Sequence, residues 1–306
     1  MVRFSPERGL NPGKPSIWFS LLLLFTLVSH ACTSSPDPEI ITLTDEEARQ
    51  DAEQDEQEIS VTLPDDLDVT LWASQRLMSD PVAIHMDNQG QALITVTRRS
   101  RGSEFDIRDV HSYWLQETIK LESVEDRREF LHRELDPSRS DENAGFLPDL
   151  NEDGVHDWRD LTVMKEEVYR ISDESGDGLA DRSQLVIRDF HEEVTDVAGG
   201  VLAHEDEIFL AVGPDLWRLR DTNGDGMADW KESISHGYNV HIGFSGHGMS
   251  GLVTGPDGRI YWGIGDMGMN AVDQDGKRWF YPHEGVIVRS EPDGSNFEVF
   301  ASGLRN

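Results

Sequence analysis

The chain has 306 residues, enough for one large domain or two modest ones, and its formal net charge is −32 at pH 7. This charge argues against nucleic acid or an anionic membrane surface as a partner, and it favours solubility or the binding of divalent cations. Cys32 is the single cysteine, so the sequence excludes an intrachain disulfide, a thiolate zinc cluster and a haem attachment motif.

Residues 1–32 have the pattern of a targeting segment. A basic start precedes an apolar run at residues 17–28, which is too short for a stable membrane span and suits a signal peptide. Cys32 directly follows a small residue, and this resembles a bacterial lipobox in which the cysteine is lipidated. The alternative is ordinary signal cleavage nearby. Both predict an exported protein, periplasmic or at the cell surface, and a lipid anchor is the only membrane contact expected.

Residues 33–60 are rich in Ser, Pro, Asp, Glu and Gln and have almost no apolar residues after Ile41. Such a segment cannot bury a core, so we predict a disordered acidic tether, with at most a transient helix at residues 46–58. Folded sequence is expected to begin near Val61.

The remaining chain repeats a strand–turn–strand pattern, which predicts an all-β fold. Asp173 and Asp221 occupy matching places and are 48 residues apart, about the length of one four-stranded propeller blade. A helical insertion is expected at about residues 103–147, with helices near 113–121 and 123–135. The predicted strands are 69–72, 81–86, 92–96, 167–170, 185–188, 200–203, 208–212, 216–218, 251–254, 260–264, 285–289 and 297–300.

Three acidic loops carry oxygen-bearing side chains at positions 1, 3, 5 and 9 and glycine at position 6, the spacing of a calcium loop. Position 12 is a carboxylate in the first and third loops and Gln184 in the second. We therefore predict structural Ca²⁺, and the alternative is an Asp/Gly-rich turn that needs no metal. The candidate ligands are Asp149, Asn151, Asp153, Asp157 and Asp160 in the first loop, Asp173, Ser175, Asp177 and Asp181 in the second, and Asp221, Asn223, Asp225, Asp229 and Glu232 in the third.

A histidine and an aspartate flank the clearest hairpin, residues 251–264, whose turn is Pro256-Asp257-Gly258. His247 precedes the first strand and Asp266 follows the second, so the hairpin is expected to bring them together. A carboxylate beside an imidazole fixes the tautomer and raises basicity, as in a general base. The alternative is a loop histidine beside flexible glycines.

With Arg305 and Asn306 downstream, this spacing resembles the soluble quinoprotein glucose dehydrogenases and the wider glucose/sorbosone dehydrogenase family. The resemblance implies a six-bladed β-propeller that holds pyrroloquinoline quinone (PQQ) over its central channel. It also implies that His247 takes the substrate hydroxyl proton, that Asp266 is its carboxylate partner, and that Arg305 and Asn306 contact quinone and substrate. Gly246 stands where the glucose enzymes carry an acid.

The acidic loops and residues 104–108 are more similar to large exported propeller proteins described as membrane-bound or sorbosone-type dehydrogenases. A propeller must close on itself, and the β sequence here suffices for about four blades. We therefore expect a partial propeller from a longer protein, inactive on its own.

The expected function is a PQQ-dependent sugar or polyol dehydrogenase with an electron acceptor such as a cytochrome c. The alternatives are a non-catalytic, calcium-stabilised propeller that binds glycans or protein partners at the cell surface, and a structural lipoprotein without a ligand.

Overall fold

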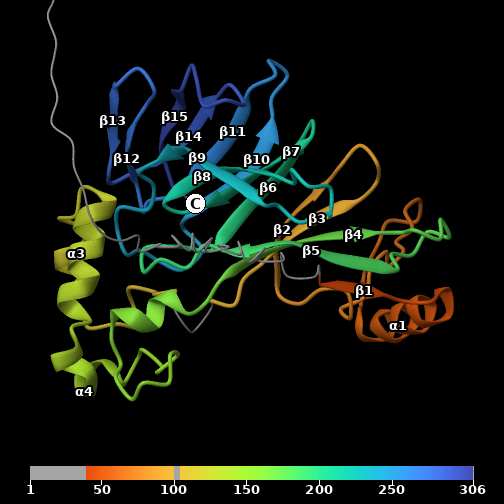
Figure 1. The fold of residues 1–306 in the computed structure, drawn as a ribbon, viewed down its shortest axis with the longest axis horizontal. Coiled ribbons are helices and arrows are strands. Elements are labelled where there is room, and N and C mark those ends of the chain that lie inside the picture. The colour runs from red at the N-terminus through yellow and green to blue at the C-terminus, as the bar shows by residue number, and fades with distance from the viewer. Residues whose placement is uncertain (1–38, 100–103, 306) are drawn as a thin grey trace, which may run out of the picture. The chain divides into compact units, whose positions relative to one another are not determined.

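Alternating apolar residues and tight turns produce an all-β fold of antiparallel sheets, which confirms the predicted fold class (Figure 1). The computed structural model describes residues 39–99 and 104–305. The predictions for the signal segment, Cys32 and Asn306 lie outside these residues. No helix in the described ranges has the length and apolar character needed to cross a bilayer.

Three sheets follow one another along the chain. The first has the strand order β1-β5-β4-β3-β2, the second β6-β7-β8-β9 and the third β10-β11-β14-β15, while β12 and β13 form a separate hairpin. The strands are β1 (Ile40–Thr42), β2 (Pro81–Met86), β3 (Ala92–Val96), β4 (Glu166–Ser172), β5 (Arg182–Asp189), β6 (Ala198–His204), β7 (Glu207–Val212), β8 (Asp215–Arg220), β9 (Trp230–His236), β10 (Met249–Thr254), β11 (Ile260–Ile264), β12 (Met269–Val272), β13 (Arg278–Tyr281), β14 (Gly285–Ser290) and β15 (Glu298–Leu304).

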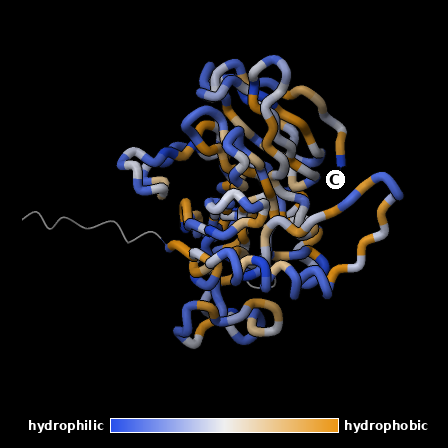
Figure 2. The backbone as a smooth tube through the Cα atoms, turned by 90° about the vertical axis from the view of Figure 1, so that its right-hand side faces the viewer, coloured by the Kyte–Doolittle hydropathy of each residue, from blue (hydrophilic) through white to orange (hydrophobic). Residues whose placement is uncertain are grey.

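The sheets pack face to face through apolar side chains, and Figure 2 shows hydrophobic residues interspersed with hydrophilic ones along the chain. One core joins the first two sheets through residues such as Val168 and Leu210, and another joins the second and third through Phe209 and Trp262. Strand β6 lies between β2 and β10. Over the described residues the sheets do not close into a ring.

Two glycines let β6 and β10 approach closely. A Cβ atom on Gly199 would lie 2.1 Å from the carbonyl oxygen of Met249, and one on Gly200 would lie 3.1 Å from the nitrogen of Gly251. Gly199 and Gly200 therefore lie beside Met249 and Gly251, so the two strands start next to each other and run in the same direction.

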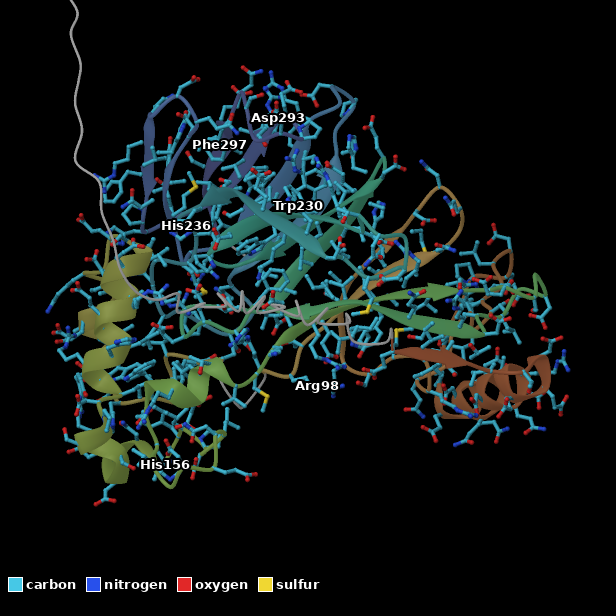
Figure 3. The ribbon with its side chains drawn as sticks, viewed as in Figure 1. Arg98, His156, Trp230, His236, Asp293 and Phe297 are labelled. Atoms are coloured by element: carbon cyan, nitrogen blue, oxygen red, sulfur yellow. The ribbon has the colours of Figure 1, made fainter. Side chains whose placement is uncertain are left out.

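Helices occupy the predicted insertion, at α2 (Trp114–Thr118), α3 (Val124–Glu134) and α4 (Ser140–Asn143), with a 3-10 turn at Pro137–Arg139. A second 3-10 turn, Trp158–Thr162, follows the insertion. The side chain of Ser123 accepts a hydrogen bond from the Asp126 nitrogen at 3.0 Å and caps α3. Apolar residues of these helices, including Trp114 and Phe130, form a core with Ile242, which precedes the third sheet. In Figure 3 the end of β9 at His236 lies beside α3, where its ring approaches Glu125.

The predicted disordered tether is wrong for residues 40–58. Strand β1 pairs with β5, and α1 (Asp45–Glu58) begins with a capping box in which Thr44 and Glu47 satisfy each other's backbone N–H groups. Ala48 and Ala52 are the buried residues of this helix and form its inner face. A small apolar stripe therefore suffices to order the segment, because polar side chains of α1 also bind Gln75 and Arg76.

The structure also corrects the strand predicted at 69–72. Residues 69–72 do not pair with another strand in a sheet. The carbonyl of Trp72 instead accepts a hydrogen bond from the Ala180 nitrogen at 2.7 Å. The sequence reading missed strands β1, β9, β12 and β13.

Candidate functional site

The third sheet brings His247 and Asp266 together at the end opposite its Pro256-Asp257-Gly258 turn. Strands β10 and β11 pair Met249 with Ile264, so the residues just outside this pair are neighbours. Nδ1 of His247 lies 2.8 Å from Oδ1 of Asp266. Their side chains are 21% and 29% exposed, so both are reachable from solvent.

The carboxylate determines the tautomer of His247. An ionised Asp266 can only accept a hydrogen bond, so Nδ1 carries the proton and donates it. In the neutral ring Nε2 then has a free lone pair, and no residue in the described ranges bonds to this atom. This arrangement can accept a proton from a bound hydroxyl group.

Arg305 and Phe244 form the outer part of the site. Nε of Arg305 lies 3.4 Å from Oδ2 of Asp266, and the arginine side chain is 69% exposed. The centroids of the Phe244 and His247 rings lie 5.3 Å apart. The guanidinium carbons of Arg108 and Arg305 lie 5.1 and 5.9 Å from the centroid of the Phe244 ring. The site thus combines a base, an aromatic surface and two cations.

Residues 104–108 form a wall that the sequence analysis did not assign to the site. Oε1 of Glu104 accepts a hydrogen bond from the Gly246 nitrogen at 2.9 Å, and Asp106 accepts one from the Ser245 nitrogen at 3.3 Å. Burial raises the pKa of Glu104, and the nearby Asp196 carboxylate adds to this effect. Because Glu104 and Gly246 are 142 residues apart, no local pattern could have revealed the contact.

Buried polar groups form the floor beneath His247. A Cβ atom on Gly248 would lie 2.5 Å from Oδ2 of Asp196 and 2.9 Å from Nδ2 of Asn239, two side chains that hydrogen-bond to each other. The buried Arg127 donates to the Asn239 carbonyl at 3.0 Å. His247 therefore sits above a fixed polar layer.

Arg99 and Glu166 extend this layer into the interior, and both are fully buried. Nε of Arg99 lies 3.1 Å from Oε1 of Glu166, whose other oxygen accepts a hydrogen bond from the Ala198 nitrogen at 2.8 Å. Arg99 also donates to the carbonyl oxygens of Leu161, Met164 and Phe190. Burial lowers the pKa of Arg99 and raises the pKa of Glu166 to about 7.

The raised pKa of Glu166 predicts a pH-dependent stability that Glu166→Gln removes. Glu166 holds its proton more tightly in the folded state than in the unfolded chain, where its pKa is 4.5. The proton therefore stabilises the fold fully below pH 4.5, and this stabilisation is lost as pH rises through about 7. From about pH 5 to about pH 8, wild type should lose about 2–3 kcal/mol relative to Glu166→Gln. Urea unfolding of both proteins at several pH values measures this difference, and a constant difference would contradict it.

The three acidic loops fold as tight turns around their first aspartate. Asp149 accepts hydrogen bonds from the nitrogens of residues 153 and 154, Asp173 from those of 176 and 178, and Asp221 from those of 224 and 226. The loops after Asp173 and Asp221 connect β4 to β5 and β8 to β9, so they occupy equivalent places in the first two sheets. This equivalence accounts for their spacing in the sequence.

The predicted ligands at the later loop positions have other partners. Asp157 is buried and ion-pairs with Arg159. Asp160 accepts hydrogen bonds from the backbone nitrogens of residues 150 and 151. Glu232 lies in β9, where it ion-pairs with Arg218 at 2.6 Å. Asp181 and Asp229 accept backbone nitrogens of their own loops. Within residues 39–99 and 104–305 no group of three or more His, Cys, Asp or Glu side chains is placed to hold a metal ion. Calcium binding by these loops stays a prediction.

A family model described as "Domain of unknown function (DUF7133)" matches residues 53–306. The chain belongs to this DUF7133 family. The matched region contains the helical insertion, the site at His247 and every strand except β1, and it begins within α1. No curated protein matches the chain. The function of this DUF7133 domain must therefore be argued from its own residues.

Proposed function

We propose that the His247 site belongs to a PQQ-dependent dehydrogenase of the glucose/sorbosone type that oxidises a sugar or polyol. The observation that carries the proposal is the hydrogen bond of 2.8 Å between Nδ1 of His247 and Asp266. It leaves Nε2 as the proton acceptor and places a carboxylate where the charged imidazolium needs stabilisation.

Each side chain has a distinct part in the proposed reaction. Nε2 of His247 takes the proton of the substrate hydroxyl group, and Asp266 holds the ring in place and stabilises its positive charge. Arg305, next to Asp266, stabilises negative charge that develops at the reacting oxygen. PQQ, when bound, supplies the two-electron acceptor for this oxidation.

The site offers groups that a planar cofactor with carboxylates can contact, and each of its two arginines also faces a carboxylate of the chain, Asp106 or Asp266. The Phe244 ring offers an aromatic surface, and Arg108 and Arg305 beside it offer guanidinium donors for carboxylates. Arg108 already pairs with Asp106, but its side chain is 69% exposed and keeps further N–H groups available. These residues would hold the cofactor next to the base.

Titrating the full chain with PQQ in the presence of Ca²⁺ tests the proposal. We expect a saturable change in quinone absorbance that Arg305→Gln weakens about tenfold or more, since a charged hydrogen bond is lost. Arg76→Gln is the matched control, because Arg76 is an exposed arginine that pairs with α1. A titration without saturation, or equal weakening by both variants, would remove PQQ from this site.

A further inference from the structure

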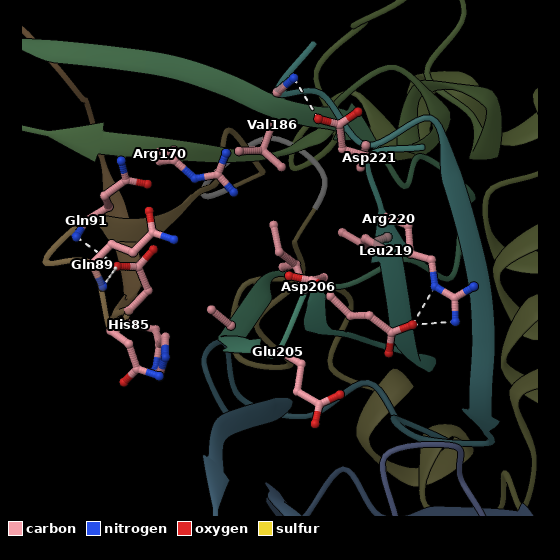
Figure 4. A pocket seen from close by; sticks show the side chains of 17 residues that line it. His85, Gln89, Gln91, Arg170, Val186, Glu205, Asp206, Leu219, Arg220 and Asp221 are labelled. Atoms are coloured by element: carbon pink, nitrogen blue, oxygen red, sulfur yellow. Dashed lines mark hydrogen bonds and ion pairs between the residues drawn. The ribbon is translucent and has the colours of Figure 1, made fainter. Parts of the chain in front are cut away.

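A cleft lies between the first and second sheets, near the β2–β3 and β6–β7 turns (Figure 4). Its volume is about 460 Å³, within the range of pockets that hold small molecules. Figure 4 shows Gln89 and Gln91 on one side, and Asp206 and Leu219 on the other.

This cleft and the His247 site are at opposite ends of the sheets. Strands β6 and β10 start side by side at Gly199 and Met249 and end side by side, where His204 approaches Thr254 at 3.5 Å. His247 comes just before the start of β10, and the cleft residues Glu205 and Asp206 come just after the end of β6. The cleft is therefore a separate site.

Arg170 is the unusual residue of the cleft. It lies in β4 opposite Leu93 and Gln184, and Leu93 belongs to the apolar core between the first two sheets. Across residues 39–99 and 104–305 its guanidinium has no ion-pair or hydrogen-bond partner, and its Nε atom is buried. The buried Nε atom has lost its hydration without gaining an acceptor, and the guanidinium lines the cleft, where a ligand can supply acceptors.

The other charges of the cleft decide which acceptor fits. Arg220 is paired with Glu207, and Asp87 and Asp221 accept backbone nitrogens of their own turns. Together with Glu205 and Asp206, these carboxylates outnumber the arginines. An anionic ligand would be repelled, so the acceptor for Arg170 should be a neutral oxygen.

We propose that this cleft binds a neutral saccharide. Each sugar hydroxyl can both donate and accept a hydrogen bond. Adjacent hydroxyls can therefore accept from Arg170, donate to the carboxylates, and do either with the side-chain amides of Gln89 and Gln91. The apolar side chains of Val186, Ile208 and Leu219 also line the cleft and suit the C–H face of a sugar ring. The cleft gives this chain a glycan-binding site apart from the His247 site.

Calorimetric titration of the full chain with glucose, mannose, N-acetylglucosamine, maltose and cellobiose tests the proposal, with glucuronate as the anionic comparison. At least one neutral sugar should bind, and Arg170→Met should weaken it about tenfold or more, because a charged donor is lost. Arg278→Met, on the separate β12–β13 hairpin, should bind as wild type does. His247→Gln should also bind normally, so failure of the proposed dehydrogenase would not affect this result.

The melting temperature of Arg170→Met separates binding from folding. Because the arginine has no partner, its apolar replacement should melt at or above the wild-type temperature. The proposal is overturned if no neutral sugar binds up to about 10 mM. It is equally overturned if glucuronate binds more tightly than every neutral sugar, or if a well-folded Arg170→Met binds as wild type does.

Discussion

In the full-length protein loaded with PQQ, the His247→Gln variant should lose about 10²–10⁴-fold in kcat for sugar-dependent dye reduction, the usual contribution of a general base. Glutamine keeps the size and polarity of the side chain but cannot take up a proton at neutral pH. The loss should appear in kcat, because the base acts as the hydroxyl proton leaves. Dye-coupled turnover measures it, and an unchanged melting temperature shows that the fold is intact.

A second histidine–aspartate pair provides the matched control. Nδ1 of His236 lies 2.9 Å from Oδ1 of Asp215, nearly the geometry of the His247 pair, but at the end of β9 beside α3. His236→Gln should therefore leave kcat unchanged. Equal activity of His247→Gln and wild type would remove the catalytic assignment of His247.

At about pH 8, above the pKa of about 7 of Glu166, Arg99→Met should destabilise the fold by about 3–5 kcal/mol, because removal of one partner leaves a buried carboxylate without its counter-charge. Arg99 and Glu166 are both fully buried, and the three carbonyl oxygens that Arg99 binds would also lose their donor. Denaturant unfolding followed by tryptophan fluorescence measures the change.

The neighbouring residue gives a close comparison. Arg98 is about half exposed and lies 3.8 Å from Glu167, so Arg98→Met should cost at most about 1 kcal/mol. A similar loss in both variants would show that the buried Arg99–Glu166 pair has no special weight in stability.

The sequence predicted the features that depend on local patterns. Alternating apolar residues and Asp-Gly turns located hairpins such as β2–β3 and β10–β11, and the β10–β11 register brings His247 and Asp266 together as expected. Ser123 marked the start of α3 because a capping side chain is a local signal.

The features that depend on distant contacts could not be predicted. Nothing near Gly246 indicates that Glu104 binds its nitrogen, and nothing near Arg170 indicates that it lacks a partner. The order of residues 40–58 had a local signal, the Thr44–Glu47 capping box, but polar composition outweighed it. Amino-acid composition indicates how much apolar surface a segment can bury. It does not reveal a short helix that packs on the fold through only two alanines.

The glycine after His247 has a consequence for changing what this site accepts. Any side chain at position 248 would be driven into Asp196 and Asn239, so enlargement there would lift the histidine out of alignment. In the proposed dehydrogenase, a change of substrate preference would therefore have to come from Glu104, which binds the Gly246 nitrogen, or from Phe244, whose ring lies beside that of His247.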